Sequence, residues 1–373
     1  MKILHLVASL GSGGAEKQLW LLCRETQGRV SHHVLALASG GCWEEPLRKA
    51  GAEVVVAGHG RVGNRRVIGG IRNAIKQAMP DIVQCWLPSV NIAGALAAHL
   101  VPGWNGAVIA SVRNVDSWKP AHYRFLERLV APLWDAVIAN SHAGAANTKA
   151  SGVEGHKVHV VPNGIPFRPI ATPAEISRTR RELNIAEDAF LISTASRLVA
   201  QKRVDRILRI ASAVAPIVPQ AVFLIAGDGA QRPALEALAA ERNLGERVRF
   251  LGELADVGPL LAASDVFLLC SEREGMSNSL LEAMQAGCVP LVTDAGDNRV
   301  ILSKVPTGLV APPEQMPAAL LHWSRYPLLF QTMRRRAREG ASHYTVQAMA
   351  AQTLEVYGQL LSEKGMEPVY ENA

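Results

Sequence analysis

One short segment, which lies between two apolar runs in the second half of the chain, constrains the fold more than any other. Residues 266–270 are apolar and predict a buried strand, and residues 289–293 predict a second one. The residues between them fit a helix at 279–286, which Ser277 or Asn278 would cap at its start and Gly287 would end. The sequence therefore predicts a strand–loop–helix–strand unit of an α/β fold, with its most distinctive polar groups in and just after the loop.

Two glutamates stand out in this unit, Glu274 in the loop and Glu282 in the helix, with seven residues between them. A carboxylate only accepts hydrogen bonds, so it suits a pair of neighbouring sugar hydroxyls. The backbone N–H groups that lead into the helix favour an anion such as a phosphate; they belong to Gly275, Met276, Ser277 and Asn278. A nucleotide sugar offers both kinds of group, although two glutamates alone would equally suit a solvated surface helix.

The whole stretch has a familiar pattern, because residues 274–292 read EGMSNSLLEAMQAGCVPLV. This pattern resembles the retaining glycosyltransferases of family 4, which have the GT-B fold and use a nucleotide-sugar donor. The resemblance implies that Glu282 binds the ribose and that Glu274 contacts the donor sugar. It also implies that backbone around a strand end, here at Phe250 and Leu251, contacts the base.

Two cations form a second motif in the same half of the chain, in the run SRLVAQKRVD that follows a predicted strand. Arg197 and Lys202 could balance the charge of a diphosphate without a metal ion. The metal-binding run Asp-x-Asp of another large glycosyltransferase fold does not occur. The resemblance implies that both cations bind the donor diphosphate, and we therefore expect no metal and no cofactor. The alternative is a solvated helix start.

A glycine-rich turn follows the first apolar run at residues 2–8 and precedes a helix that begins at about residue 15. A strand, such a turn and a helix N-terminus together form an anion cradle. Glu16 stands where a dinucleotide-binding fingerprint needs its third glycine, and no P-loop run occurs. The resemblance implies that the backbone of Gly13 and Gly14 approaches the donor diphosphate, whereas the alternative is a plain tight turn.

Basic residues concentrate in the first half of the chain. Residues 1–165 hold 17 Lys and Arg against 10 Asp and Glu, whereas the remainder holds 22 against 23. A helix that starts at residue 65 has Ile68, Ile71 and Ile75 on one face. The basic residues on and before this helix are Arg61, Arg65, Arg66, Arg72 and Lys76. We predict that they contact an anionic membrane surface, and the alternative is an ordinary surface helix.

The loop at residues 111–116 reads SVRNVD and departs from the family pattern. Many family members carry a histidine there, close to the reacting centre, and this chain has none. Arg113 and Asn114 could instead donate hydrogen bonds to the acceptor or to the donor phosphate.

A length of 373 residues predicts two domains. We expect a GT-B fold, in which two Rossmann-like domains at 1–165 and 166–350 face each other across a cleft. Residues 351–373 would form a helix that crosses back to the first domain, and a tail. The five cysteines show no C-x-x-C spacing, and no apolar run approaches a membrane span. We therefore expect reduced thiols and a cytoplasmic protein, peripheral on the inner face of the cell membrane.

The function that the resemblance implies is metal-independent hexosyl transfer with retention of configuration. The expected donor is a UDP-sugar, and the expected acceptor is a lipid-linked saccharide or a surface polysaccharide. A GDP-sugar (mannosyl) transferase remains an alternative, as do a sugar phosphorylase and a nucleotide-sugar epimerase. From another class, a basic nucleic-acid- or membrane-binding protein without catalysis also remains. The basic helix has no interleaved aromatic residues and no nucleic-acid motif occurs, so nucleic acid is not an expected partner.

Overall fold

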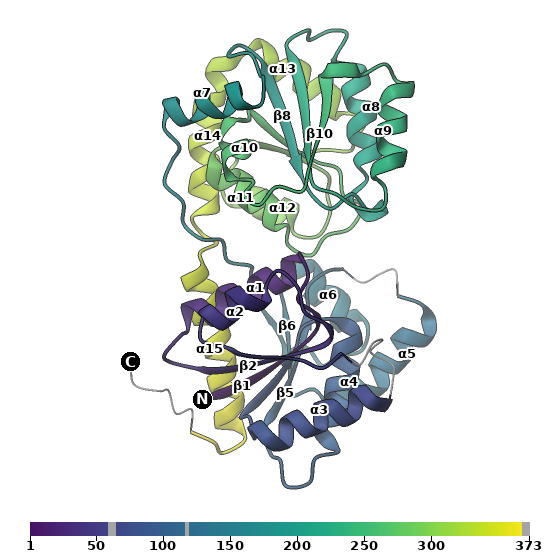
Figure 1. Cartoon of the computed structure of the whole chain (residues 1–373), viewed down its shortest axis with the longest axis vertical. Helices are drawn as coiled ribbons and strands as arrows, with labels where there is room; N and C mark the ends of the chain where they lie inside the picture. The colour runs from purple at the N-terminus through teal and green to yellow at the C-terminus, as the bar shows by residue number, and fades with distance from the viewer. Residues whose placement is uncertain (59–64, 116–118, 368–373) are drawn as a thin grey trace. The chain divides into compact units, whose positions relative to one another are not determined.

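The computed structural model describes residues 1–58, 65–115 and 119–367, except for the side chains of Arg65 and Pro327. The chain divides into two compact units, and each is described by itself. Unit 1 comprises Met1–Gly164 with Thr345–Ala373, and unit 2 comprises Ile165–Tyr344 (Figure 1).

Unit 1 contains a seven-stranded parallel sheet with the order β3-β2-β1-β4-β5-β6-β7. Its strands are β1 Lys2–Ser9, β2 Ser31–Ser39, β3 Glu53–Val56, β4 Ile82–Cys85, β5 Ala107–Val112, β6 Ala136–Ala139 and β7 Val158–Val160. Its α-helices are α1 Gly14–Glu25, α2 Glu44–Lys49, α3 Arg65–Ala78, α4 Pro88–His99, α5 Ala121–Val130, α6 His142–Ala150 and α15 Val346–Glu363.

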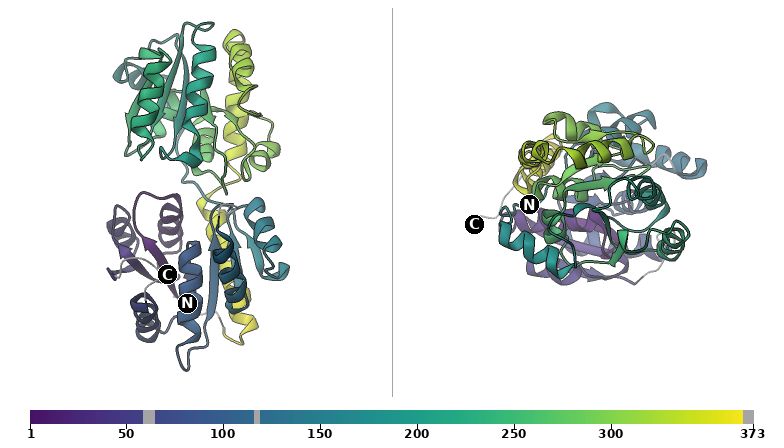
Figure 2. Two further views of the ribbon diagram at one scale, coloured as in Figure 1. Left: turned by 90° about the vertical axis from the view of Figure 1, so that its right-hand side faces the viewer. Right: turned by 90° about the horizontal axis from the view of Figure 1, so that it is seen from above.

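Helices cover both faces of this sheet because alternate strand residues point to opposite sides. Ile3 and Val7 of β1 join a core with residues of α1 and α15, whereas Leu4 and Leu6 join another with α3 and α4. The last helix, α15, packs against α1 within unit 1, and it is the yellow helix of Figure 2. Tyr357 of this helix is completely buried.

Unit 2 contains a six-stranded parallel sheet with the order β10-β9-β8-β11-β12-β13. Its strands are β8 Phe190–Ala195, β9 Ala221–Ala226, β10 Val248–Gly252, β11 Val266–Leu269, β12 Val289–Val292 and β13 Leu309–Val310. Its α-helices are α7 Pro173–Glu182, α8 Val204–Val214, α9 Arg232–Glu241, α10 Gly258–Ala263, α11 Asn278–Ala286, α12 Asn298–Lys304, α13 Met316–Arg325 and α14 Pro327–Ala341.

The helix predicted in the glutamate segment is confirmed as α11. The Ser277 hydroxyl caps it by accepting a hydrogen bond from the Leu280 N–H, and Gly287 ends it at a φ of 84°. That left-handed conformation favours glycine over residues that carry a Cβ.

Both sheets contain a topological switch point, where successive connections leave in opposite directions. It lies between β1 and β4 in unit 1 and between β8 and β11 in unit 2. Ligands of open parallel sheets bind beyond the carboxyl ends of the strands at such a point. Ligand-binding residues are therefore expected in the segments that follow these four strands. Among the described residues, no helix is long and apolar enough to cross a membrane.

Candidate functional site

The switch point of unit 2 brings two predicted site residues into contact. Lys202 ends the 3₁₀ turn Ala200–Lys202 after β8, and Glu274 lies in the loop after β11. The Lys202 Nζ atom lies 2.6 Å from Oε1 of Glu274, and their side chains are only 15% and 8% exposed. The ammonium and carboxylate, 72 residues apart in sequence, therefore form a nearly buried ion pair.

Two further hydrogen bonds hold the two loops together beside this pair. The side-chain amide of Gln201 donates to the Arg273 carbonyl at 2.7 Å, and the Glu272 N–H donates to the Gln201 carbonyl at 2.9 Å. The geometry of the pair is thus fixed by its neighbours and does not depend on the two charged side chains alone.

The loop after β12 packs against the glutamate loop. The Asp297 N–H donates to the Gly275 carbonyl at 3.0 Å. Gly296 adopts a φ of 56°, and a Cβ there would lie 2.3 Å from the same carbonyl oxygen. Only glycine allows this approach, which encloses Met276 and Ser277 at the start of α11. Asn278 is half-buried as the first residue of that helix.

Glu282 lies on α11, between the fully buried residues Leu281 and Ala283. It is itself half-buried, so its carboxylate side chain faces away from the core. The carboxylate raises the pKa of Arg168, after the larger effect of the hydrogen bond from Arg168 to Asp256.

Arg197 is exposed on a tightly packed turn after β8, and within the described residues its side chain makes no hydrogen bond or ion pair. The turn is held by the loop that follows β9, because the Leu198 N–H donates to the Asp228 carbonyl at 2.8 Å. A Cβ at Gly227 would lie 1.9 Å from the Ser196 carbonyl oxygen. This turn therefore presents a free guanidinium on a rigid backbone.

The remaining donor-site predictions fall on two further segments. Phe250 and Leu251 are half-buried in β10, whose end is tied to β9 by the Gly227 N–H, 2.6 Å from the Gly252 carbonyl. Gly13 and Gly14 belong to unit 1, where Gly13 directly precedes α1. A Cβ at Gly13 would lie 1.9 Å from Oε2 of Glu16, so that carboxylate folds back over the glycine turn.

The predicted basic face is described only in part, because Arg61 and the side chain of Arg65 lie outside the described residues. Arg66 and Lys76 are exposed on α3, and Arg72 is half-buried. After β5, Nη2 of Arg113 donates to Oδ1 of Asn163 at 2.6 Å, and Oδ1 of Asn114 accepts from the Val115 N–H at 2.8 Å.

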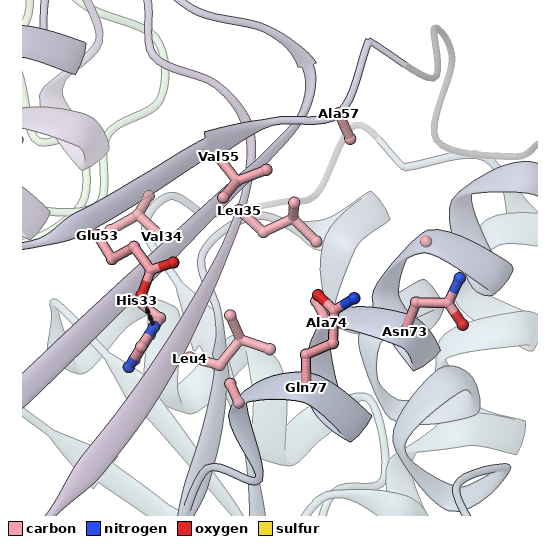
Figure 3. Close-up of a pocket in the computed structure, with 12 residues that line it drawn as sticks. Leu4, His33, Val34, Leu35, Glu53, Val55, Ala57, Asn73, Ala74 and Gln77 are labelled. Atoms are coloured by element: carbon pink, nitrogen blue, oxygen red, sulfur yellow. Dashed lines mark ion pairs between the residues drawn. The ribbon is translucent and has the colours of Figure 1, made fainter.

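A cavity of about 340 Å³, which no sequence pattern predicted, lies between α3 and strands β1, β2 and β3 of unit 1 (Figure 3). Leu4 and Leu35 line it together with an ion pair of 2.9 Å between Nδ1 of His33 and Oε2 of Glu53. None of the predicted site residues lines it. The signal in the sequence was a row of small residues on the inner side of α3, namely Gly70, Ala74 and Ala78.

A buried group of metal-ligating side chains was also not predicted. It consists of His5, Cys23 and His32, whose ligand atoms lie within 4.8 Å of one another. Nε2 of His5 and Nδ1 of His32 are already hydrogen-bonded to each other at 2.9 Å. Their donors and acceptors are used within the protein, so this group supports no metal site.

Comparison with known proteins agrees with this architecture. The family model "Glycosyltransferase Family 4" matches residues 12–168, and the model "Glycosyl transferases group 1" matches residues 175–353. Glycosyltransferase EpsF of Bacillus subtilis is 27% identical over 83% of this chain and 82% of its own.

A relative from Campylobacter jejuni is 27% identical over 76% of this chain and 77% of its own. Its name describes an α-1,4-N-acetyl-D-galactosaminyltransferase that acts on a saccharide linked to PP-undecaprenol. The crystal structure of Anabaena HepE in complex with UDP-glucose superimposes with a TM-score of 0.83, at 23% identity, over 95% of this chain and 98% of that one. The two Rossmann-like sheets and the two family models together show that this chain belongs to glycosyltransferase family 4 and has the GT-B fold.

Proposed function

We propose that this glycosyltransferase moves a hexosyl group from a UDP-sugar to a hydroxyl of a lipid-linked saccharide or surface polysaccharide. The observation that carries the proposal is the ion pair between Lys202 and Glu274 at the switch point of unit 2. It puts a cation suited to phosphate beside a carboxylate suited to sugar hydroxyls. The UDP-glucose complex of HepE and the PP-undecaprenol acceptor of the Campylobacter relative support the donor and acceptor classes.

The proposed roles follow the charges that develop during transfer. As the bond between the sugar and the diphosphate breaks, negative charge grows on the leaving diphosphate. Arg197, Lys202 and the backbone of Gly13 and Gly14 would stabilise it, and such electrostatic stabilisation is commonly worth about 3 kcal/mol for each lost donor. The two cations support metal-independent catalysis, because they supply the positive charge that a metal ion would otherwise supply.

Glu274 would orient the donor sugar through its hydroxyls, and Glu282 would bind the ribose. Phe250 and Leu251 would contact the base through backbone, and the N–H groups of the loop from Gly275 to Asn278 would bind phosphate. The acceptor oxygen would attack the face that the diphosphate leaves, so that configuration is retained, and its proton would pass to a donor phosphate oxygen.

A nucleotide panel tests the donor assignment. UDP, GDP and ADP are added in turn to the parent and to Glu282→Ala, and the melting temperature is measured. We expect UDP to raise the melting temperature of the parent, by an amount that grows with concentration, and Glu282→Ala to lose most of that rise. The matched control is Glu241→Ala, an exposed glutamate at the end of α9, which should respond like the parent.

The panel also separates the alternatives. A response to GDP alone would replace the UDP-sugar by a GDP-sugar such as a mannosyl donor. An equal response of Glu282→Ala and the parent would contradict the assigned site. Product analysis with and without an acceptor distinguishes transfer from phosphorolysis or epimerisation, because only transfer needs the acceptor hydroxyl.

We further propose that unit 1 contacts an anionic membrane at its cytoplasmic face. Arg66 and Lys76 of α3 supply exposed positive charge, each worth about 1 kcal/mol near such a surface. Helix α5 adds three large apolar side chains that are 45–62% exposed, and their neighbours include two arginines. These side chains are Phe125, Leu126 and Leu129. All five cysteines are free, which fits a reducing compartment.

Vesicle sedimentation tests the membrane proposal. We expect the parent to sediment with vesicles that contain anionic lipid and to remain in solution with zwitterionic ones. Phe125→Ser should weaken sedimentation, whereas Leu328→Ser, at an 80% exposed leucine of α14 in unit 2, should not. Equal sedimentation with both kinds of vesicle would contradict the role of the basic residues.

A further inference from the structure

Arg113 lies at the edge of the sheet of unit 1, close to the switch point. It directly follows β5, at the carboxyl edge of the sheet, one strand away from the switch point between β1 and β4. Its guanidinium lies over the ring of Trp86, 5.3 Å from the ring centre, and Trp86 directly follows β4. Arg113 therefore lies at the edge where ligands of open parallel sheets bind.

The guanidinium has few partners in the part of the chain that the structure describes. Nη2 donates to the buried Asn163 at 2.6 Å. Nε is shut off from solvent and has no hydrogen-bond partner, and among residues 1–58, 65–115 and 119–367 no carboxylate forms an ion pair with Arg113. Burial lowers the pKa of Arg113 to about 10, and the carboxylate of Glu16 offsets only part of this effect.

Arg180 is a structural arginine in unit 2, and its hydrogen-bond partners can be compared with those of Arg113. It is 6% exposed, and its guanidinium donates to the carbonyls of Ala263, Glu187 and Ala189 at 2.9–3.2 Å. It also pairs with Asp265 at 3.1 Å. Every nitrogen of Arg180 thus has a protein partner, as a buried cation requires. Among the described residues Arg113 has only the hydrogen bond to Asn163 and no ion-pair partner, so its charge is available to a ligand.

The ring beneath Arg113 is held by a chain of buried hydrogen bonds whose direction is fixed. An indole N–H can only donate, so Trp86 donates to Nδ1 of His5 at 3.1 Å. Nε2 of His5 must then donate to Nδ1 of His32 at 2.9 Å, and Nε2 of His32 to Thr26 at 2.7 Å. The Thr26 hydroxyl donates to the Leu22 carbonyl at 2.7 Å. Both imidazoles are neutral, and the platform is rigid before any ligand arrives.

We propose that Arg113 binds an anionic group of the acceptor, a phosphate or a carboxylate, and so selects acceptors that carry one. The inference rests on the proposed transfer function, in which the cations of unit 2 bind the donor diphosphate. A planar guanidinium matches two oxygens of either anion at once. The anion belongs either to a diphosphate that links the saccharide to a lipid or to an acidic sugar of the acceptor itself.

Binding measurements on the full chain test the inference. The donor site is first filled with saturating UDP, and octyl diphosphate and methyl glucuronide are then titrated separately by calorimetry. The parent should bind one of the two probes. Arg113→Gln should bind it about tenfold more weakly or worse, the factor expected for one lost charge-assisted hydrogen bond. Arg113→Lys should recover part of the affinity. Arg29→Gln, at an exposed arginine between α1 and β2, is the matched control and should bind like the parent.

The melting temperature without ligand gives a second readout. Because Arg113→Gln removes an unpaired charge, it should melt at or above the temperature of the parent, whereas an arginine that serves the fold would lower it on removal. Preference for octyl diphosphate would identify the lipid linkage, and preference for the glucuronide would identify an acidic sugar.

Equal affinity of the parent and Arg113→Gln, or no binding of either probe by the parent, would overturn the inference. The same holds if Arg113→Gln melts at a lower temperature and Arg113→Lys does not restore probe binding. Failure of the proposed function is seen separately, because UDP would then not bind when it is added to fill the donor site.

Discussion

The ion pair between Lys202 and Glu274 raises a question of competition. The ammonium of Lys202 lies 2.6 Å from the Glu274 carboxylate, whereas in the proposed mechanism it binds the donor diphosphate. Two unit charges about 4 Å apart interact by about 4 kcal/mol at the effective dielectric constant of a protein surface, so Glu274 is a strong competitor for that cation. Glu274→Gln keeps the size of the side chain and removes the charge.

Glu274→Gln should have opposite effects on stability and on UDP affinity. The change leaves a nearly buried cation without a partner, which costs about 3 kcal/mol of the free energy of unfolding and lowers the melting temperature by about 6–12 °C. UDP should then bind about tenfold more tightly than in the parent, because the diphosphate no longer competes with a carboxylate. Sugar transfer should nevertheless be slower, because the donor sugar loses a hydrogen-bond acceptor.

Thermal shifts at several UDP concentrations measure both effects. Without UDP, Glu274→Gln should have a lower melting temperature than the parent. Each UDP concentration should raise the melting temperature of this variant more than that of the parent. The double variant Lys202→Met/Glu274→Gln is the control, since removal of both charges should recover stability but not UDP affinity. If Glu274→Gln instead binds UDP as weakly as Lys202→Met does, Glu274 positions the lysine for the diphosphate, and the reasoning from competition is refuted.

Three further outcomes are expected. Burial holds the pKa of His5 well below its usual value and that of His32 at about 3, so only the unfolded chain takes up these protons as pH falls below about 6.5. Stability should therefore be lost from about pH 6.5 downwards, by about 2 kcal/mol for each histidine at pH 5, and pH-dependent denaturation with His32→Gln as comparison would measure it. Gly296→Ala should lower the melting temperature and UDP affinity together, because its Cβ would meet the Gly275 carbonyl at 2.3 Å. Gly69→Ala, with no atom within 4 Å of the added Cβ in helix α3, should stabilise the protein by about 0.5–1 kcal/mol in urea denaturation and leave UDP binding unchanged.

Local chemistry made several elements predictable from the sequence. The start of α11 follows from the capping hydroxyl of Ser277, and its end follows from Gly287, which adopts the left-handed conformation. The two glutamates could be assigned to a loop and a helix because these signals lie within a few residues of them. The alternation of β1 between two cores follows in the same way from its apolar run.

Long-range pairing decided what could not be predicted. Lys202 meets Glu274 only because β11 pairs with β8, and no local pattern specifies that two strands more than 70 residues apart are neighbours. The platform under Arg113 depends likewise on β1 lying between β2 and β4, which brings His5 between His32 and Trp86. The residues that flank each of these side chains in the sequence form no recognisable motif, so the hydrogen-bond network becomes apparent only from the order of the strands in the sheet.

The two switch points differ in how they hold charge. In unit 2 the Lys202 ammonium already forms an ion pair with the Glu274 carboxylate, so an incoming diphosphate has to compete with Glu274 for that cation. In unit 1 the cation at the sheet edge has no ion-pair partner among the described residues, and its position is fixed by a hydrogen bond and an aromatic platform instead. A buried charge that is left unpaired costs stability unless a ligand provides the counter-charge. The guanidinium of Arg180 has protein partners for its charge and for every nitrogen. Arg113 has no ion-pair partner among the described residues and lies at the edge where ligands bind, so its role is recognition rather than folding.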